Sequence, residues 1–479
     1  MTNKNVFLCF ICIISAIGGL LFGYDTVVIG ATINLIKTQF SISPAMEGWF
    51  VSSALAGCLI GVMIAGGFSD KFGRKPSMFL SALALIISSI WCGYAGNIEQ
   101  LIIARIIGGI GVGLASIVSP LYISEISPAH LRGRMVSLFQ FSICVGICAA
   151  MFVNSQIVAL ASRAQWEGHF HKIFTQESWR GMFLGELIPA SLFFLLCIII
   201  PESPRWLAKE NMIDKARLIL SKIRTPQETQ QELSEINNAV SHETSSIMQL
   251  VAPHMRKVLF IGMFLAIFSE LSGITVVMYY GPSLLENAGL SQTGALGGHM
   301  CIGIALTVFT MLSIWLVDIL GRRLLLFIGN TGCFISLLMI GLLFQIGHSE
   351  NALITSLAIL FASMDINTDM MLVIMMCLFV ASFAFSLGPI KWIVISEIFP
   401  TKIRGRAVAI CTMALWLTDV CLNQFFPIVQ SKYGASVSFF TFAIFLVPQF
   451  IFIIKIMPET KGKSLEEIES NWERISQAS

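Results

Sequence analysis

Apolar segments of membrane-spanning length recur from one end of this chain to the other, and they restrict its fold more than any other feature. A helix needs roughly 20 apolar residues to cross a bilayer. Twelve segments approach or exceed this length, with approximate cores at 6–30, 50–68, 77–95, 101–122, 136–160, 181–200, 258–280, 298–317, 324–346, 371–395, 407–427 and 436–457. A membrane β-barrel would instead show short alternating segments. The sequence therefore predicts an all-α membrane protein with twelve transmembrane helices.

The charged residues indicate which side of the membrane each loop faces. One set of short loops is rich in basic residues, namely Lys71, Arg74, Lys75, Arg132, Arg134, Arg322, Arg323, Lys402, Arg404 and Arg406. The opposite loops carry fewer, namely Lys37, Arg163, Lys172, Arg180 and Lys432. The positive-inside rule then predicts a multi-pass protein of the inner (cytoplasmic) membrane with both termini in the cytoplasm. The first segment lacks a small-residue cleavage site, so we interpret it as a span and not as a signal peptide.

A long polar interruption divides the spans into six and six. We predict an N-terminal six-helix bundle (1–200), a cytoplasmic helical linker (201–257), a C-terminal six-helix bundle (258–457) and a cytoplasmic tail (458–479). Three motifs occur in both halves in the same order: DKFGRK and DILGRR, SEISPAHLRGR and SEIFPTKIRGR, PESPRW and PETKGK. Two repeated halves related by an axis along the membrane normal are typical of transporters, which bind substrate between the halves near the midplane.

Acidic and basic side chains recur together in these repeated loop motifs. We interpret them as cytoplasmic ion pairs that form when the inner side closes and break when it opens. The alternative is that they are topology signals in solvated turns. The candidate gate residues are Asp70, Arg74, Glu125, Arg132, Arg134, Glu202, Arg205, Asp318, Arg322, Glu397, Arg404 and Arg406.

Three ionisable residues lie at similar depth within spans of the N-terminal half. With a rise of 1.5 Å per residue, Asp25 lies roughly 28 Å from the inner end of its span, in the outer third of the bilayer core. Arg105 and Glu186 lie roughly 6 Å and 8 Å below the outer face. A lone charge at a helix centre costs about 2.5–3.5 kcal/mol, and two carboxylates flanking one guanidinium lower that cost. Protonating Asp25 would release Arg105 toward Glu186, which suggests proton coupling; a static ion pair is the alternative.

Several motifs together resemble the sugar porter family of the major facilitator superfamily. They are GGLLFGYD, DKFGRK, RIIGGIGVGLAS, SPLYISEISPAHLRGR, PESPRWL, SEIFPTKIRGR and PETKGKSLEEIE, and they extend over nearly the whole chain. Within the family the chain is similar to bacterial xylose–proton symporters. The resemblance implies two six-helix bundles, an intracellular helical linker and alternating access for a monosaccharide or polyol. It also implies that Asp25 and Arg105 serve proton coupling and that Glu186 assists.

The positions at which this family reads sugar hydroxyls with amides differ here. The resemblance implies amides in spans five, seven and eleven, where this chain has Ile147, SELSGIT (269–275) and Leu415–Trp416. An ordinary sugar is therefore less strongly indicated than the loop motifs alone suggest. A polyol, an amino or acidic sugar, or another charged metabolite remains open.

Charged residues appear in the spans of the C-terminal half instead. Glu270 and Asp419 lie roughly 18 Å into their spans, and Lys391 lies in the inner half of span ten. We expect Lys391 to pair with Glu270 or Asp419, because buried membrane charges usually have a functional partner. The alternative is that Lys391 reaches the cytoplasm and that Glu270 faces a water-filled cavity. The candidate substrate-binding residues are Ser269, Glu270, Thr275, Tyr279, Tyr280, Lys391, Trp392, Trp416 and Asp419.

The leading hypothesis is a proton-coupled symporter that imports a sugar or polyol by alternating access. A transporter of a charged, amino or acidic sugar-like metabolite, an uncoupled facilitator and a drug-type antiporter are the transport alternatives. A nutrient receptor on this scaffold would typically add a long tail, whereas we expect a short one. No nucleophile–base pair, metal cluster or phosphate loop is apparent in the sequence, so we expect no enzyme activity, cofactor or metal. The expected partners are the small-molecule substrate, protons and the lipid bilayer, with no nucleic acid, and we expect a monomer.

Overall fold

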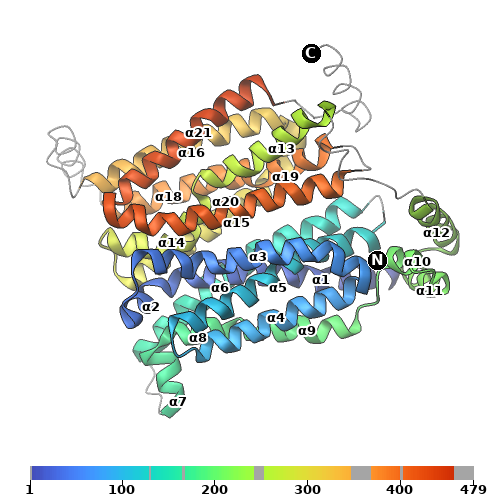
Figure 1. The fold of residues 1–479 in the computed structure, drawn as a ribbon, viewed down its shortest axis with the longest axis horizontal. Coiled ribbons are helices and arrows are strands. Elements are labelled where there is room, and N and C mark those ends of the chain that lie inside the picture. Colours follow the sequence, from blue (N-terminus) through green and yellow to red (C-terminus); the bar gives the residue numbers. More distant parts are fainter. Residues whose placement is uncertain are drawn as a thin grey trace. The chain divides into compact units, whose positions relative to one another are not determined.

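The computed structural model describes residues 3–128, 131–163, 168–241, 253–346, 368–399 and 403–457. Within these ranges all regular secondary structure is helical (Figure 1). Twelve of the described helical stretches are long and apolar enough to cross a membrane. A helix satisfies its own backbone hydrogen bonds, which lipid cannot do, so the apolar composition and the helical fold have the same cause. The predicted all-α fold with twelve transmembrane helices is confirmed.

The chain divides into two compact units. The N-terminal unit comprises residues 1–28, 53–153 and 160–244, and the C-terminal unit comprises residues 29–52, 154–159 and 245–479. The ends of the first two spans and a short part of the fifth are thus grouped with the C-terminal unit, and the first helices of the linker with the N-terminal unit. The domain boundaries at 200, 257 and 457 stay a prediction.

The long helices of the first half are closely packed where glycines line their contacts. A Cβ atom at Gly109 would lie 2.0 Å from the carbonyl oxygen of Ala54, and one at Gly57 would lie 2.2 Å from that of Ile106. Small residues spaced four apart allow such close approach of membrane helices. Apart from the linker, the described helices that lie mostly in the N-terminal unit are α1 (Asn3–Val28), α3 (Pro44–Phe72), α4 (Arg74–Tyr94), α5 (Ile98–Ile126), α6 (Arg132–Arg163), α7 (Gly168–His171), η2 (Lys172–Gln176), α8 (Ser178–Gly185) and α9 (Leu187–Ile199).

The linker contains three described helices, α10 (Pro204–Lys209), α11 (Ile213–Ile223) and α12 (Pro226–Ser241). They form a small cluster beside the N-terminal unit's α1 and α5, in which α11 contacts α1, α10 contacts α5, and α12 packs on α10 and α11 (Figure 1). Nη2 of Arg224 donates to the carbonyl oxygen of Ile126 at 3.1 Å, and the hydroxyl of Tyr122 donates to that of Pro201 at 2.8 Å. These bonds fix the linker to the last turns of α5.

Two spans of the C-terminal unit are broken helices. Span seven is divided into α13 (Pro253–Leu271) and α14 (Ile274–Asn287), and span ten into α18 (Thr368–Phe385) and α19 (Leu387–Ile398). At the first break Gly273 has φ 84°, and a Cβ atom there would lie 2.4 Å from the ring of Phe442. The other described helices of this unit are η1 (Ile29–Ala31), α2 (Ile33–Phe40), α15 (Gln292–Leu320), α16 (Arg322–Gln345), α20 (Arg404–Tyr433) and α21 (Ala435–Lys455).

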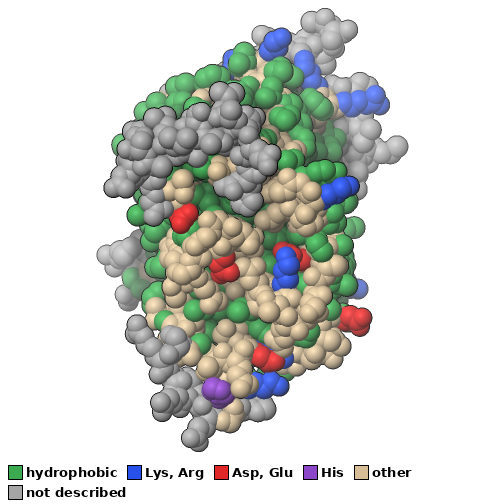
Figure 2. Space-filling model, turned by 90° about the vertical axis from the view of Figure 1, so that its left-hand side faces the viewer, with side chains coloured by type: hydrophobic (Ala, Val, Ile, Leu, Met, Phe, Trp, Pro, Cys, Tyr) green, Lys and Arg blue, Asp and Glu red, His purple; other side chains and the backbone are tan. Residues whose placement is uncertain are grey.

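Large apolar side chains are exposed along the membrane helices. Ile188, Ile444 and Met63 are 76%, 64% and 62% exposed. In lipid such exposure is favourable, whereas in water extended apolar patches are rare on monomers. On the face drawn in Figure 2, acidic and basic side chains stand singly or in small groups among hydrophobic and uncharged ones.

Candidate functional site

Asp25 and Arg105 form a buried ion pair in the N-terminal unit. Nη1 of Arg105 lies 2.6 Å from Oδ1 of Asp25, and the guanidinium also donates to the backbone carbonyl of Asp25 at 3.4 Å and 3.5 Å. Asp25 lies near the end of α1, and Arg105 near the start of α5. Both side chains are almost fully buried. Removing either partner would leave an uncompensated charge, which is strongly unfavourable in a low-dielectric environment.

Glu186 brings a second carboxylate to this pair. It lies at the break between α8 and α9, is 1% exposed, and interacts electrostatically with both Asp25 and Arg105. Its Oε1 has no hydrogen-bond partner among the described residues. Phe183, one turn earlier, places its ring centroid 5.7 Å from the guanidinium carbon of Arg105. The structure therefore brings together all three residues that were predicted to serve proton coupling.

Lys391 and Glu270 form a second buried ion pair, in the C-terminal unit. Each lies close to a helix break, Glu270 at the end of α13 and Lys391 near the start of α19. Asp419, from α20, interacts electrostatically with both Glu270 and Lys391. Oγ1 of Thr275 donates to Oδ1 of Asp419 at 3.1 Å. Of the two partners considered for Lys391, the structure thus selects Glu270 for the direct ion pair.

The other predicted substrate residues differ in their burial and in their contacts with this cluster. Oγ of Ser269 donates to the Ala266 carbonyl at 2.9 Å and to the Glu270 carboxylate at 3.3 Å. The rings of Tyr279 and Trp416 are buried. Trp392 is 37% exposed, and its ring centroid lies 5.6 Å from Nζ of Lys391.

Asn423 lies beside this cluster and was not predicted from the sequence. This fully buried side chain donates from Nδ2 to Oγ1 of Thr275 at 3.2 Å and to the Asp419 carbonyl at 3.0 Å. The hydroxyl of Tyr280 donates to the carbonyl of Asn423 at 3.1 Å. Asn423 follows Asp419 by four residues in one helix and therefore lies on the same face. This four-residue spacing is the sequence feature from which Asn423 could have been predicted.

Arg74 is the centre of an ion-pair network at the start of α4. Its Nη2 and Nε donate to the two carboxylate oxygens of Glu125 at 2.8 Å and 2.9 Å, which is a bidentate arrangement. Its Nη1 also donates to Asp70 at 3.2 Å. Gly73 precedes it with φ 100° and ψ 167°, and a Cβ atom there would lie 2.4 Å from the Glu202 carboxylate.

The C-terminal unit repeats this arrangement. Nη2 of Arg322 lies 2.9 Å from Oε1 of Glu397, and Gly321, with φ 84° and ψ 162°, precedes the arginine as Gly73 precedes Arg74. Repeated sequence motifs thus adopt repeated local structures. Each of these ion pairs lies within one unit.

The remaining gate candidates are not part of these two ion-pair arrangements. Arg132 donates through Nε to the Ser124 carbonyl at 3.0 Å, and Arg134, Arg205 and Arg406 are exposed. The side chains of Asp318 and Arg404, and the PETKGK motif, lie outside the described residues.

Glu202 accepts hydrogen bonds from the backbone N–H groups of Arg74, Lys75 and Ser203. Burial raises the pKa of Glu202 above its ordinary value of 4.5, against the lowering effect of these hydrogen bonds. The folded protein therefore binds this proton more tightly than the unfolded chain. The resulting contribution to stability is fully present below the unfolded-state pKa and is lost as the pH rises through the folded-state pKa.

We therefore expect Glu202→Gln to unfold at a temperature that depends less on pH in the acidic range than that of the unmodified protein. Thermal unfolding in detergent over a pH series measures this slope. The exposed Glu210→Gln serves as the control and should leave the slope unchanged. An unaltered slope in Glu202→Gln would contradict the assignment.

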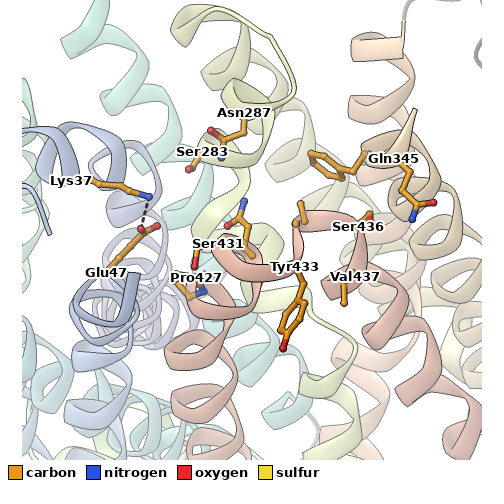
Figure 3. Close-up of a pocket in the computed structure, with 14 residues that line it drawn as sticks. Lys37, Glu47, Ser283, Asn287, Gln345, Pro427, Ser431, Tyr433, Ser436 and Val437 are labelled. Atoms are coloured by element: carbon orange, nitrogen blue, oxygen red, sulfur yellow. Dashed lines mark ion pairs between the residues drawn. The ribbon is translucent and has the colours of Figure 1, made fainter. Parts of the chain in front are cut away.

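A separate pocket of about 770 Å³ lies in the C-terminal unit, where α16 and α20 end and α21 begins. Figure 3 shows Lys37 and Glu47 paired at its edge, with Nζ and Oε2 2.8 Å apart, and Tyr433 beside the turn into α21. Ser283 and Asn287 of α14 also line it. None of the described residues that line the pocket belongs to either buried charge cluster or to the predicted substrate residues.

Comparison with protein families identifies the chain. The family model described as "Sugar (and other) transporter" matches residues 11–472. The chain belongs to the sugar transporter family. The resemblance predicted from the motifs is thereby confirmed.

Two curated relatives of this family member cover nearly its whole length. The arabinose-proton symporter of Bacillus subtilis (strain 168) is 37% identical over 467 residues, which is 97% of this chain and 95% of the relative. The D-xylose-proton symporter of Escherichia coli (strain K12) is 35% identical over 495 residues, again 97% of this chain and 95% of the relative. A solved structure of the inward-open xylose transporter XylE from E. coli matches with a TM-score of 0.80 at 35% identity, over 96% of this chain and 99% of that one.

Proposed function

We propose that this sugar transporter family member is a proton-coupled symporter that imports a neutral sugar or polyol by alternating access. The observation that carries the proposal is the buried Asp25–Arg105 pair, with the Glu186 carboxylate beside it. Two relatives that match nearly the whole chain are named as sugar–proton symporters. A passive facilitator needs no titratable group in this position, and buried membrane carboxylates are costly unless they have a role.

The proposed proton coupling follows from the charges of Asp25, Arg105 and Glu186. With Asp25 ionised, Arg105 is held by two kinds of contact, to the carboxylate and to the backbone carbonyl of the same residue. Protonation of Asp25 removes the Coulomb attraction and leaves Arg105 with the neighbouring Glu186 as its remaining anionic partner. A change of partner by one guanidinium is a two-state element that proton binding can bias.

The substrate is proposed to contact residues of the C-terminal unit near its broken helices. Broken membrane helices expose backbone polar groups beside a binding site in many transporters. Ser269, Thr275, Tyr279, Tyr280, Trp392 and Trp416 are the proposed neutral contacts. The Arg74–Glu125 and Arg322–Glu397 pairs are proposed to stiffen the cytoplasmic end of each half during closure. We further propose a monomer in the inner membrane with both termini in the cytoplasm.

Uptake into proteoliposomes tests the proposed function. The probes are labelled D-xylose, L-arabinose, D-glucose, myo-inositol, glucosamine and glucuronate, each with and without a pH gradient that is acidic outside. We expect at least one neutral sugar or polyol to rise above its external concentration only when the gradient is present. Uptake that stops at equal concentrations under both conditions would identify a facilitator instead.

A further inference from the structure

The pocket of about 770 Å³ in the C-terminal unit has the size of a small-molecule site (Figure 3). Its walls come from the last turns of α14, α16 and α20, from the first turn of α21, and from Lys37 and Glu47 at one edge. Proteins bind small molecules in pockets of roughly 300–1,000 Å³. The space is therefore large enough for a monosaccharide.

Three carboxamide side chains from three different helices line this pocket. They are Asn287 of α14, Gln345 of α16 and Gln430 of α20. A carboxamide has two N–H donors and one carbonyl acceptor, so it can pair with a hydroxyl group, which both donates and accepts. Within the described ranges, none of the three side chains is engaged in a hydrogen bond. A bound molecule with several hydroxyl groups can therefore pair with them.

Hydroxyl groups and aromatic rings complete the lining. Ser283 of α14 and Ser436 of α21 are buried, and the Ser283 hydroxyl donates to Oδ1 of Asn34 at 2.9 Å. Phe344 of α16 and Tyr433 of α20 contribute two rings. Aromatic rings supply apolar surface for the C–H groups of a sugar, while amides and hydroxyls pair with its polar groups. Both kinds of surface are present in this pocket.

The charges at the pocket favour a neutral ligand. Among the described lining residues, Lys37 and Glu47 are the charged ones, and their Nζ and Oε2 atoms lie 2.8 Å apart. Glu286, which accepts a hydrogen bond from Asn34, and the exposed Lys432 lie outside the lining. An ionised ligand would have to break the lysine–glutamate pair to gain an opposite charge from the lining, whereas a neutral one leaves it intact.

The pocket lies at the end of the C-terminal unit opposite to the Arg322–Glu397 pair. α16 begins at Arg322 and reaches the pocket with its last two residues, and its 24 residues span about 36 Å at a rise of 1.5 Å per residue. α21 begins at the pocket and ends at Lys455. In the proposed orientation Arg322 is cytoplasmic, so the pocket faces the outside. Tyr433 is 58% exposed, which shows that the pocket opens to solvent.

We propose that this pocket is a second binding site for the neutral sugar or polyol that the protein imports, at the outer end of the C-terminal unit. The inference rests on the proposed function for the class of its ligand. Asn287, Gln345 and Gln430 pair with the hydroxyl groups, and the Tyr433 ring covers one face of the ligand. Because the described lining includes no residue of the buried charge clusters, binding here requires no proton gradient.

Hydrogen exchange detected by mass spectrometry locates the bound ligand in the full chain, held in nanodiscs without a pH gradient. The neutral probes are D-xylose, L-arabinose, D-glucose and myo-inositol, and glucuronate is the charged probe. We expect a transported neutral probe to slow exchange in peptides that cover residues 283–290 and 427–437. Glucuronate should leave exchange in both peptides unchanged.

Two substitutions remove hydrogen-bonding groups while nearly keeping side-chain size, Gln430→Met and Asn287→Leu. Each should raise the probe concentration for half protection of the pocket peptides about fivefold, because each removes a hydrogen bond to the ligand. Gln292→Met is the matched control, since Gln292 is an exposed carboxamide at the start of α15 outside the lining, and it should change nothing. Asn287 is exposed, so its replacement leaves the helix packing intact.

Each other outcome has a definite meaning. Pocket peptides that stay unprotected at a probe concentration that saturates uptake would overturn the second site but leave the proposed symport intact. Equal protection by glucuronate would overturn the neutral ligand class, and unchanged half protection in both variants would overturn the assignment to these residues. Protection of the pocket peptides in a protein that fails to accumulate the same sugar under a pH gradient would overturn the proposed coupling and support the pocket.

Discussion

Replacing Asp25 by Asn should lower the accumulation ratio of a transported sugar by about tenfold for each unit of pH gradient. Asn has nearly the same shape and still accepts a hydrogen bond from Arg105, but it cannot bind or release a proton. The variant is therefore a mimic of the protonated state. Because its Arg105 no longer faces an ionised partner at 2.6 Å, exchange of sugar across the membrane should persist while the coupling of one proton is lost.

The measurement compares accumulation and exchange in the same proteoliposomes. Asp214→Asn is the matched control, because Asp214 is an aspartate of the same unit whose side chain is 99% exposed, and it should accumulate sugar normally. An Asp25→Asn protein with the accumulation ratio of the unmodified protein would exclude Asp25 as a proton carrier. Asp25 would then serve only as the structural ion-pair partner of Arg105.

Replacing Lys391 by Met should destabilise the protein by about 3–5 kcal/mol. Lys391 is the cation that Glu270 contacts directly, and Asp419 lies beside the pair. Without the ammonium group, two buried carboxyl groups remain with no opposite charge in the cluster. Removal of one partner from a buried ion pair is costly mainly because the other charge stays buried.

A second substitution distinguishes this cause from loss of packing. The double variant Lys391→Met/Glu270→Gln removes both charges of the pair and should recover most of the lost stability, because neutral replacements of both partners are often tolerated. Equilibrium unfolding in mixed micelles measures each variant, with the exposed Lys222→Met as control. Equal stability of Lys391→Met and the unmodified protein would show that Glu270 is not ionised there.

The transmembrane helices follow from the sequence because each apolar segment must satisfy its own backbone within lipid. The breaks within these helices are less directly predictable from the sequence. At Gly273 the chain adopts φ 84° and packs against Phe442, a residue of another span. Such a contact depends on how α14 and α21 are rotated, and no local pattern in residues 269–275 contains that information.

The contacts of the charged side chains are likewise only partly predictable from the sequence. Depth along a helix places Asp25 and Arg105 at one level, so their proximity is predictable from counting residues. Lys391 had two acceptable carboxylates at similar depth, and the choice of Glu270 for the direct contact depends on helix rotation. Asn423 is uncharged and was overlooked, although its spacing from Asp419 places it on the same face.

The most direct test of the central claim, that sugar and protons cross together, is proton movement driven by sugar alone. Proteoliposomes that contain a trapped pH indicator and have no initial pH gradient receive external D-xylose, L-arabinose or myo-inositol. Proton symport predicts that the interior becomes more acidic as the transported sugar enters, and that the signal is reduced in Asp25→Asn. Entry of labelled sugar with no change of internal pH would contradict the account.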